Sequence, residues 1–232
     1  MSQLNYTVTV STLNHLPALN TIQFTLNSHH YPTRRNAIKT LQTLLSQTKS
    51  NIVVHYDFIY IPSRFGFFSK RVQNDILTEV INLLHFIDKN PRVLGIVFHT
   101  DYSLPLKVYQ SPDVHKAIDS HYNSIIFDNE SIHKIVDSDS VLTQNIFTFY
   151  DGLKNLPPHL LSKVFLENTT SVSRVTKEGS VQSIYEISKK FGFGLCIDTE
   201  HEFAVTSNYI TPDKVLDYKK DVNVMVHLNT IP

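Results

Sequence analysis

Five short apolar stretches of this sequence each end in a side chain that can bind a divalent cation. The end residues are His55, His99, Glu167, Asp198 and His227. A further histidine, His201, lies three residues after Asp198. Imidazole and carboxylate ligands without a thiolate cluster are typical of sites for Zn²⁺, Mn²⁺ or Fe²⁺. One such residue is more often a hydrogen-bonded or capping residue, but the recurrence at five successive stretches predicts a metal centre.

Glu167 ends the stretch KVFLE (163–167). A carboxylate at the mouth of a buried strand is costly unless a partner compensates its charge. Lysine, arginine or backbone amides would be ordinary partners, and a metal ion is the functional alternative. A carboxylate can also bridge two metal ions, which in phosphoryl transfer stabilise the attacking and leaving oxygens. A metal ion at Glu167 would favour a catalytic site rather than a structural one, with Glu167 as its catalytic residue.

Seven apolar stretches rich in β-branched residues are the strand candidates. They cover residues 6–10, 21–25, 51–55, 93–99, 163–167, 194–198 and 222–227. Segments 35–48, 70–89 and 180–192 between them place apolar side chains at helical spacing, and Gly192 is a candidate helix C-cap. Strands that alternate with helices predict a parallel sheet with right-handed crossovers, covered by helices on its apolar strands.

The expected fold class is α/β, a TIM-type (β/α) barrel formed by a single domain over residues 1–232. A complete barrel has eight strands, so seven candidates predict an incomplete one. In such a barrel all carboxyl ends of the strands open onto one face, which would bring the five end residues together. Residues 101–158 exceed the length of one crossover and predict an inserted elaboration of two or three helices.

Composition limits the function classes. The chain has 232 residues, 41% hydrophobic and 18% charged, and 21 Lys and Arg balance 21 Asp and Glu. Net charge therefore does not predict nucleic-acid binding, although a local basic patch would be enough for it. Cys196 is the only cysteine, which excludes an intramolecular disulfide. The absence of a signal-peptide pattern and of an apolar run of membrane-span length predicts a cytoplasmic, reducing location.

The segments FLENT (165–169), GLCIDTEHEFA (194–204) and VHLN (226–229) resemble the endonuclease IV family of apurinic/apyrimidinic (AP) endonucleases. VVHYDFIYIPS (53–63) resembles the third-strand motif of this family. VFHT (97–100) resembles its fourth, with Thr100 where proline is usual. Members are xylose-isomerase-like TIM barrels with a trinuclear zinc site that cleave DNA 5′ to an abasic sugar. The resemblance implies a metal-dependent endonuclease, a hydrolase of DNA repair acting on abasic or damaged DNA.

The same resemblance implies the ligands. The first zinc would be held by the histidines of the third and fourth strands, and the second by the end residues of the sixth and seventh, with Glu167 bridging the two. Those residues are His55, His99, Asp198 and His227. His201 would bind a third zinc. The remaining ligands of the family would follow the seventh strand, and the printed sequence ends at Pro232 without them. Two zinc ions are therefore expected, with Mn²⁺ as an alternative metal.

Two other functions stay open at this point. One is a catalytically impaired structural protein, or a DNA- or protein-binding protein, derived from the same fold. The other is a sugar isomerase or epimerase, since such barrels use similar mixed ligands. The expected partner is DNA with abasic sites, with no membrane association. An open barrel edge after the seventh strand would expose unpaired backbone groups. We therefore expect the inserted region, the N-terminal segment, a second subunit or another protein to cover it.

Overall fold

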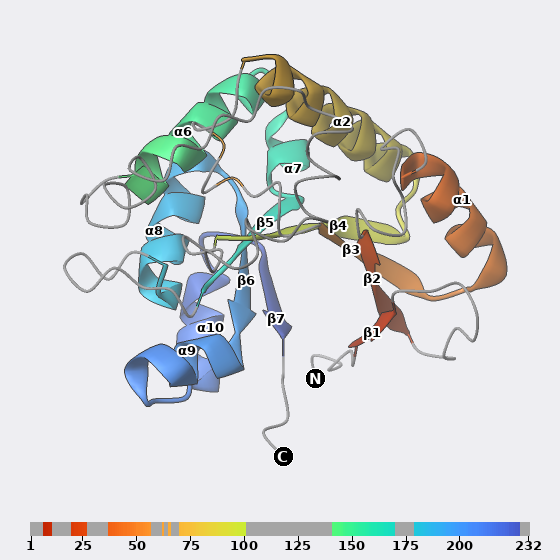
Figure 1. Ribbon diagram of the computed structural model, residues 1–232. Coiled ribbons are helices and arrows are strands. Elements are labelled where there is room, and N and C mark those ends of the chain that lie inside the picture. Colours follow the sequence, from red (N-terminus) through yellow and green to blue (C-terminus); the bar gives the residue numbers. More distant parts are fainter. Residues whose placement is uncertain are drawn as a thin grey trace, which may run out of the picture.

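The computed structural model describes residues 7–10, 20–26, 37–56, 62, 65, 70–100, 141–169 and 179–227. Its centre is one sheet of parallel strands that follow one another in chain order (Figure 1). The strands are β1 Thr7–Val10, β2 Thr21–Leu26, β3 Asn51–Tyr56, β4 Val93–His99, β5 Val164–Glu167, β6 Gly194–Asp198 and β7 Val224–His227. All seven predicted strands are confirmed, and their ends differ from the predicted ones by two residues at most.

Helices α1, α2, α6 and α8 lie along the outer side of the curled sheet (Figure 1). The described helices are α1 Ala37–Gln47, α2 Lys70–Lys89, α6 Val141–Leu153, α7 Pro158–Leu161, α8 Val181–Phe191, α9 Thr199–Thr206 and α10 Pro212–Tyr218. The three predicted helices correspond to α1, α2 and α8, and Gly192 caps α8 in the left-handed region with φ 75°. None of the described helices is long and apolar enough to cross a membrane.

Strands and helices alternate along the chain, and the sheet curls into part of a TIM-type barrel, which confirms the α/β fold class. The predicted insertion at 101–158 is only partly visible, because residues 101–140 lie outside the described residues. Within the remainder, α6 contributes Ile146, Phe149 and Leu153 to the core. In the described part of the chain, β1 and β7 are the two edge strands of the sheet and each pairs on one side only. The cover expected over the β7 edge therefore stays a prediction.

The two faces of the sheet pack differently. Side chains that point outward, such as Val54, Phe98 and Leu166, join the large core cluster beneath the helices. Side chains that point inward form a smaller cluster of Val53, Val97, Phe165 and Cys196. The alternation has the period of two that a strand imposes on its side chains. The inner face of the described strands therefore carries a small apolar layer.

Strand register carries the end residues onto this inner face. His99 pairs in register with Glu167, and Asp198 pairs with His227. His55 pairs with Val97, which precedes His99 by two residues and so shares its face. Because all strands are parallel, these residues also share the carboxyl edge of the sheet. The fold thus places a ring of polar side chains directly above the apolar layer.

Two glycines make room for the Phe165 ring at the base of this layer. A Cβ on Gly95 would lie 2.5 Å from the ring carbon Cε2 of Phe165 and 2.6 Å from the backbone oxygen of Lys163. A Cβ on Gly194 would lie 2.6 Å from Cδ1 of the same ring. We therefore expect Gly95→Ala to lower the free energy of unfolding by about 1–3 kcal/mol, the usual cost of overpacking, as measured by urea denaturation.

Gly152→Ala is the matched control for Gly95→Ala. Gly152 lies in α6, and its added Cβ would meet the terminal carbons of Leu77, a side chain that can rotate away. Alanine is also favoured over glycine in a helix by about 1 kcal/mol. A loss of stability for Gly95→Ala no larger than that for Gly152→Ala would show that the Phe165 ring is not tightly enclosed.

Candidate metal centre

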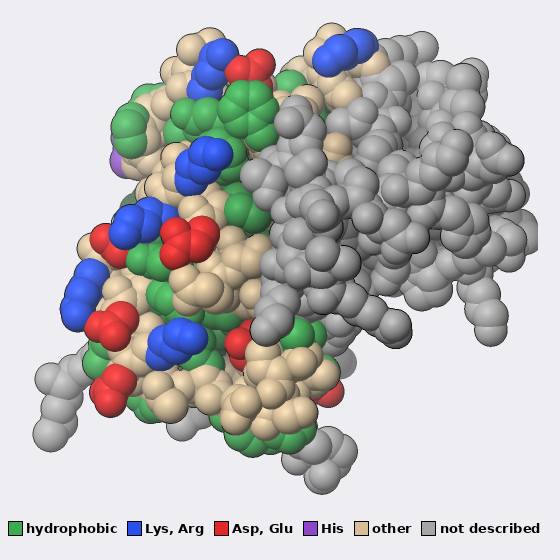
Figure 2. All heavy atoms as spheres, turned by 90° about the vertical axis from the view of Figure 1, so that its left-hand side faces the viewer, with side chains coloured by type: hydrophobic (Ala, Val, Ile, Leu, Met, Phe, Trp, Pro, Cys, Tyr) green, Lys and Arg blue, Asp and Glu red, His purple; other side chains and the backbone are tan. Residues whose placement is uncertain are grey.

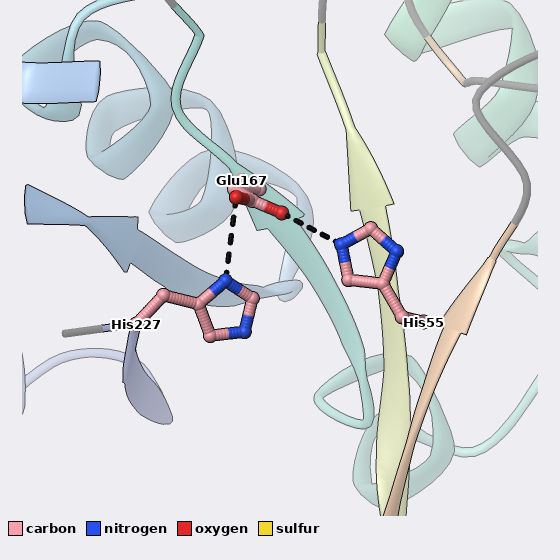
Figure 3. A group of neighbouring side chains, drawn as sticks. All are labelled: His55, Glu167 and His227. Atoms are coloured by element: carbon pink, nitrogen blue, oxygen red, sulfur yellow. Dashed lines mark hydrogen bonds and ion pairs between the residues drawn. The ribbon is translucent and has the colours of Figure 1, made fainter. Parts of the chain in front are cut away.

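The Glu167 carboxylate lies at the centre of the polar ring, and only 1% of the residue is exposed (Figure 3). Its Oε2 is 3.2 Å from Nε2 of His55, and its Oε1 is 3.3 Å from Nδ1 of His227. Nε2 of His99 lies 3.9 Å from Oε2, and Nδ1 of His201 lies 3.8 Å from Oε1. Each carboxylate oxygen therefore faces its own pair of imidazoles.

These contacts answer the question of what compensates the buried carboxylate. In the part of the chain that the structure describes, the ion-pair partners of Glu167 are histidines rather than lysine or arginine. Burial opposes the charged form of Glu167, but hydrogen bonds with His227 and His55 hold its pKa well below the usual range. Burial also opposes protonation of His227, yet the hydrogen bond with Glu167 raises the pKa of that imidazole. Without a metal ion, the carboxylate is thus compensated by its contacts with the surrounding imidazoles, and the contact with Glu167 favours the protonated form of His227.

The stability of the metal-free protein should depend on pH through this pair. The contribution of Glu167 is complete above its unfolded pKa of 4.5 and is lost as pH falls through the depressed folded value. The contribution of His227 is complete below its unfolded pKa of 6.5 and is lost as pH rises through the raised folded value. In EDTA, the stability of the wild type relative to Glu167→Gln should therefore be greatest near about pH 5.5 and smaller near about pH 8.5.

Urea denaturation of both proteins at the two pH values measures this difference. Other titrating groups are shared by the two proteins, so their pH dependence cancels in the comparison. A difference that stays constant between the two pH values would show that Glu167 and His227 do not form an ion pair in the folded protein.

Asp198 has a second role beside that of candidate ligand. Its Oδ1 accepts hydrogen bonds from the backbone amides of Glu200 and His201, each at 2.9 Å, and so caps the start of α9. An aspartate at a helix N-cap is held in one orientation by these bonds. The cap therefore fixes the carboxylate at the edge of the site and carries His201 into it on the first turn of the helix.

Neighbouring groups fix the imidazole orientations of His201 and His227. Nδ1 of His201 is 2.9 Å from the backbone oxygen of Asn168, so this nitrogen carries the proton and Nε2 presents the lone pair. Nε2 of His227 lies 3.5 Å from Sγ of Cys196. Burial raises the pKa of the Cys196 thiol well above its usual value, and the nearby carboxylates add to this effect. Cys196 is therefore a buried neutral thiol, as its place within a strand predicts.

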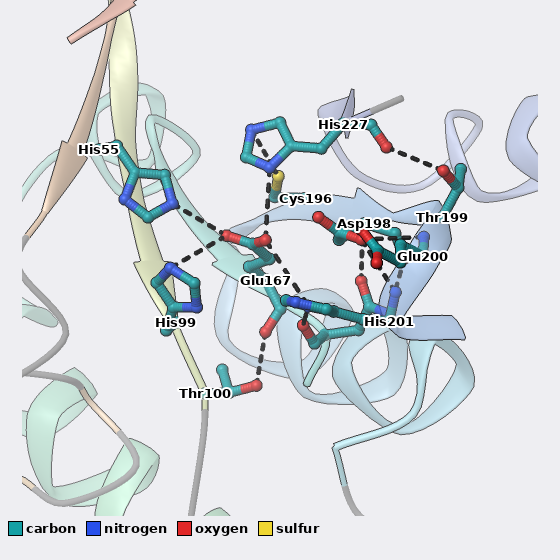
Figure 4. A network of polar contacts seen from close by, with 11 residues as sticks. His55, His99, Thr100, Glu167, Cys196, Asp198, Thr199, Glu200, His201 and His227 are labelled. Carbon is teal, nitrogen blue, oxygen red and sulfur yellow. Dashed lines mark hydrogen bonds and ion pairs between the residues drawn. The ribbon is translucent and has the colours of Figure 1, made fainter. Parts of the chain in front are cut away.

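The structure brings all six predicted site residues to one edge of the sheet (Figure 4). Ligand atoms lie within 4.8 Å of one another in two groups, His55–Glu167–His227 and Glu167–Asp198–His201, while His99 adjoins the first group. Imidazoles and carboxylates around one buried carboxylate fit Zn²⁺ or Mn²⁺. These side chains could thus hold metal ions, and the identity of the metal stays a prediction.

Sequence reasoning passed over Asn168, which is fully buried beside Glu167. Its side chain donates from Nδ2 to the backbone oxygen of Asp198 and accepts at Oδ1 from the backbone amide of Asp198. The available signal was its position, because a polar amide directly after a ligand-capable strand end sits beside the next strand end. Asn168 thus connects the ends of β5 and β6.

Comparison with known proteins gives no family assignment, since no protein family and no curated protein matches the chain. Among solved structures, the apo form of 3-keto-D-glucoside 4-epimerase, YcjR, from E. coli aligns with a TM-score of 0.49 and 10% identity. That alignment covers 90% of this chain and 68% of the epimerase. SacUVDE aligns with a TM-score of 0.35 and 14% identity, over 97% of this chain and 76% of its own. Similarity at this level assigns no function, so the function has to be argued from the site.

Proposed function

We propose that this protein is a metal-dependent phosphodiesterase that cleaves DNA at abasic or otherwise damaged positions. The observation that carries the proposal is that Glu167 presents its two oxygens to two separate pairs of histidines. A carboxylate placed in this way could serve as a ligand to two cations, as in two-metal sites for phosphoryl chemistry. When bound, two such cations supply charge stabilisation for the attacking and leaving oxygens of a phosphodiester.

The residues divide between the two oxygens. His55 and His99 lie on the Oε2 side of Glu167, and His201 and His227 lie on the Oε1 side. An apolar cluster lies beneath the site on the inner face of the sheet, so we expect a substrate to approach from the carboxyl edge of the strands. His55 and His99 on one side and His227 on the other agree with the ligand assignment that the resemblance to endonuclease IV implies. His201, which the same resemblance assigns to a third zinc, lies on the His227 side and departs from that assignment. The two-sided arrangement supports a dinuclear zinc site, with Mn²⁺ as the alternative.

The charge of the described outer face does not favour DNA contact on the outer helices. Lysines and acidic side chains are interspersed over the face that carries α6, α8 and α10 (Figure 2). Several of them form ion pairs, including Lys189 with Asp221 at 3.0 Å and Lys220 with Asp217 at 2.6 Å. Such a mixed surface attracts a polyanion weakly. The candidates for a local basic patch are Arg34, Arg35, Arg64, Lys70 and Arg71 in the first third of the sequence. Of these, residues 34, 35 and 64 lie outside the described residues, so a basic rim stays a prediction.

A nicking assay tests this function. The purified protein is incubated with a duplex that contains one abasic site and with the same duplex intact, in Zn²⁺, Mn²⁺ or EDTA. We expect cleavage of the abasic duplex with metal and none in EDTA, and His55→Ala excludes a contaminating nuclease. No nicking with any divalent metal would overturn the proposal. Conversion of simple aldoses by the same protein would instead favour a sugar isomerase or epimerase.

A further inference from the structure

Three polar residues stand directly after the candidate ligands that end β4, β5 and β6. They are Thr100, Asn168 and Thr199. Each donates a side-chain hydrogen bond to the backbone carbonyl of the candidate ligand on the next strand. Figure 4 shows the bonds of Thr100 and Thr199. We propose that these three strand-end latches are positioning residues that set the spacing of the metal ligands, an inference that rests on the proposed metal-dependent function.

The latches act where the ladder of the sheet ends. The last carbonyl of a strand has no ladder donor beyond it, and a buried carbonyl without a partner costs about 1–3 kcal/mol. Thr100, itself fully buried, meets this need by donating from Oγ1 to the carbonyl of Glu167 at 2.5 Å. The bond fixes the backbone from which the Glu167 side chain starts. It therefore limits where the two carboxylate oxygens can lie.

Asn168 extends the pairing of β5 with β6. Backbone register between these strands ends with Glu167 opposite Cys196, two residues before Asp198. The Asn168 amide continues the pattern, because it donates to the carbonyl of Asp198 at 3.1 Å and accepts from its amide at 2.6 Å. Its own carbonyl faces Nδ1 of His201. One residue thus fixes the positions of two candidate ligands and the tautomer of the histidine.

Thr199 holds the last strand. Its Oγ1 donates to the carbonyl of His227 at 3.2 Å. All four residues of β7 are only partly buried, so packing restrains this strand less than its neighbours. Because the position of His227 depends more on a single hydrogen bond, we expect the Thr199 latch to have the larger effect on metal binding of the two threonine latches.

The test replaces a hydroxyl by a methyl group of the same size. Thr100→Val and Thr199→Val are titrated with Co²⁺, and the absorption of the bound ion reports affinity and coordination geometry. Partners of metal ligands are typically worth about 10- to 100-fold in metal affinity, and we expect a loss in this range. Thr100→Ser and Thr199→Ser retain the hydroxyl and should recover most of the affinity.

Ser188→Ala is the matched control. Ser188 is fully buried and donates from Oγ to the carbonyl of Gly194 at 3.0 Å, the same kind of bond at the opposite end of β6. Its loss should lower stability without changing Co²⁺ affinity. A second measurement is the NMR chemical shift of the histidine imidazole nitrogens in the metal-free proteins. These resonances should shift in the two valine variants and should not shift in Ser188→Ala.

The outcomes separate this inference from the proposed function. If the valine variants bound Co²⁺ as tightly as the wild type and their imidazole resonances did not shift, the proposed positioning role of the latches would be wrong. Absence of Co²⁺ binding by the wild type would overturn the metal-dependent function, and the imidazole signals would still decide whether the latches position the histidines. Tight Co²⁺ binding without DNA cleavage would overturn the endonuclease alone. If Thr100→Val does not fold, Thr199→Val at the less buried strand decides the question.

Discussion

Glu167→Gln should reduce metal-dependent cleavage by about a thousandfold, or about 4 kcal/mol of transition-state stabilisation, and should release at least one metal ion. Glutamine keeps the size of the side chain but removes the charge that faces histidines on both sides. Its amide nitrogen offers no lone pair, so one of the two sides of the site loses its oxygen ligand. Nicking rates on an abasic duplex and elemental analysis of the metal content measure the two effects.

Glu186→Gln is the control for this substitution. Glu186 is exposed on α8 and accepts a hydrogen bond from Gln182, so the same chemical change there should leave activity and metal content as in the wild type. Thermal unfolding in EDTA checks that Glu167→Gln is folded. If Glu167→Gln kept its full metal content and cleaved within tenfold of the wild-type rate, Glu167 would not be the shared ligand.

The candidate site was predictable because the sequence shows two things. It shows which residues of a strand share one face of the sheet, and the alternation with helices indicates that the strands are parallel. Apolar residues alternate toward the sheet faces, and parallel strands gather their carboxyl ends at one edge. Several strand boundaries differed from their predictions by one or two residues, and β3, for example, runs one residue past His55 to Tyr56. The Tyr56 ring packs on Phe98 with centroids 5.0 Å apart, so outer-face packing extends the strand beyond the polar residue. Local sequence does not show this tertiary contact.

Helices α9 and α10 escaped the sequence analysis for a different reason. No residue of α9 is buried, so it lacks the apolar stripe by which a helix is recognised. Asp198 is its N-cap, and a single aspartate at a strand end can equally be a cap or a ligand. In α10 only Tyr218 is buried, although Thr211 and Pro212 form an ordinary helix start. Cap signals would have found both helices where periodicity could not.

The three strand-end latches could not be predicted from the sequence, because each hydrogen bond depends on the register between neighbouring strands. Thr100 and Thr199 are recognisable as polar residues after strand ends, but the carbonyl that each one meets is set by the register of the next strand. The fourth-strand motif of the endonuclease IV family, which VFHT resembles, usually has proline at the position of Thr100. Proline has no donor group and could not make this hydrogen bond to the carbonyl of Glu167. This chain therefore holds the end of β4 against β5 by a contact that its resemblance to the family did not predict.

Zn²⁺ should raise the melting temperature of the protein by about 5–10 °C at about pH 7.5, and EDTA should reverse the rise. A free metal concentration of about 100 Kd contributes about 2.7 kcal/mol, and a domain of this size gains about 2–4 °C per kcal/mol. The stabilisation should largely disappear near about pH 5.5, because protons compete for the imidazole lone pairs. The raised pKa of His227 strengthens this competition at the Oε1 side of Glu167.

Two histidine variants decide where the metal binds. His55→Gln removes a nitrogen that faces Glu167 and should reduce the Zn²⁺-dependent rise. His159→Gln removes an exposed histidine that pairs with Asp88 on the surface, and the rise should remain. An equal rise in both variants would place the metal elsewhere. Between about pH 8.5 and about pH 5.5, the contribution of the Glu167–His227 pair to the stability of the metal-free protein should grow, while the Zn²⁺-dependent stabilisation should shrink. The two trends are opposite because a protonated His227 pairs with Glu167, whereas a metal ion needs the neutral imidazole.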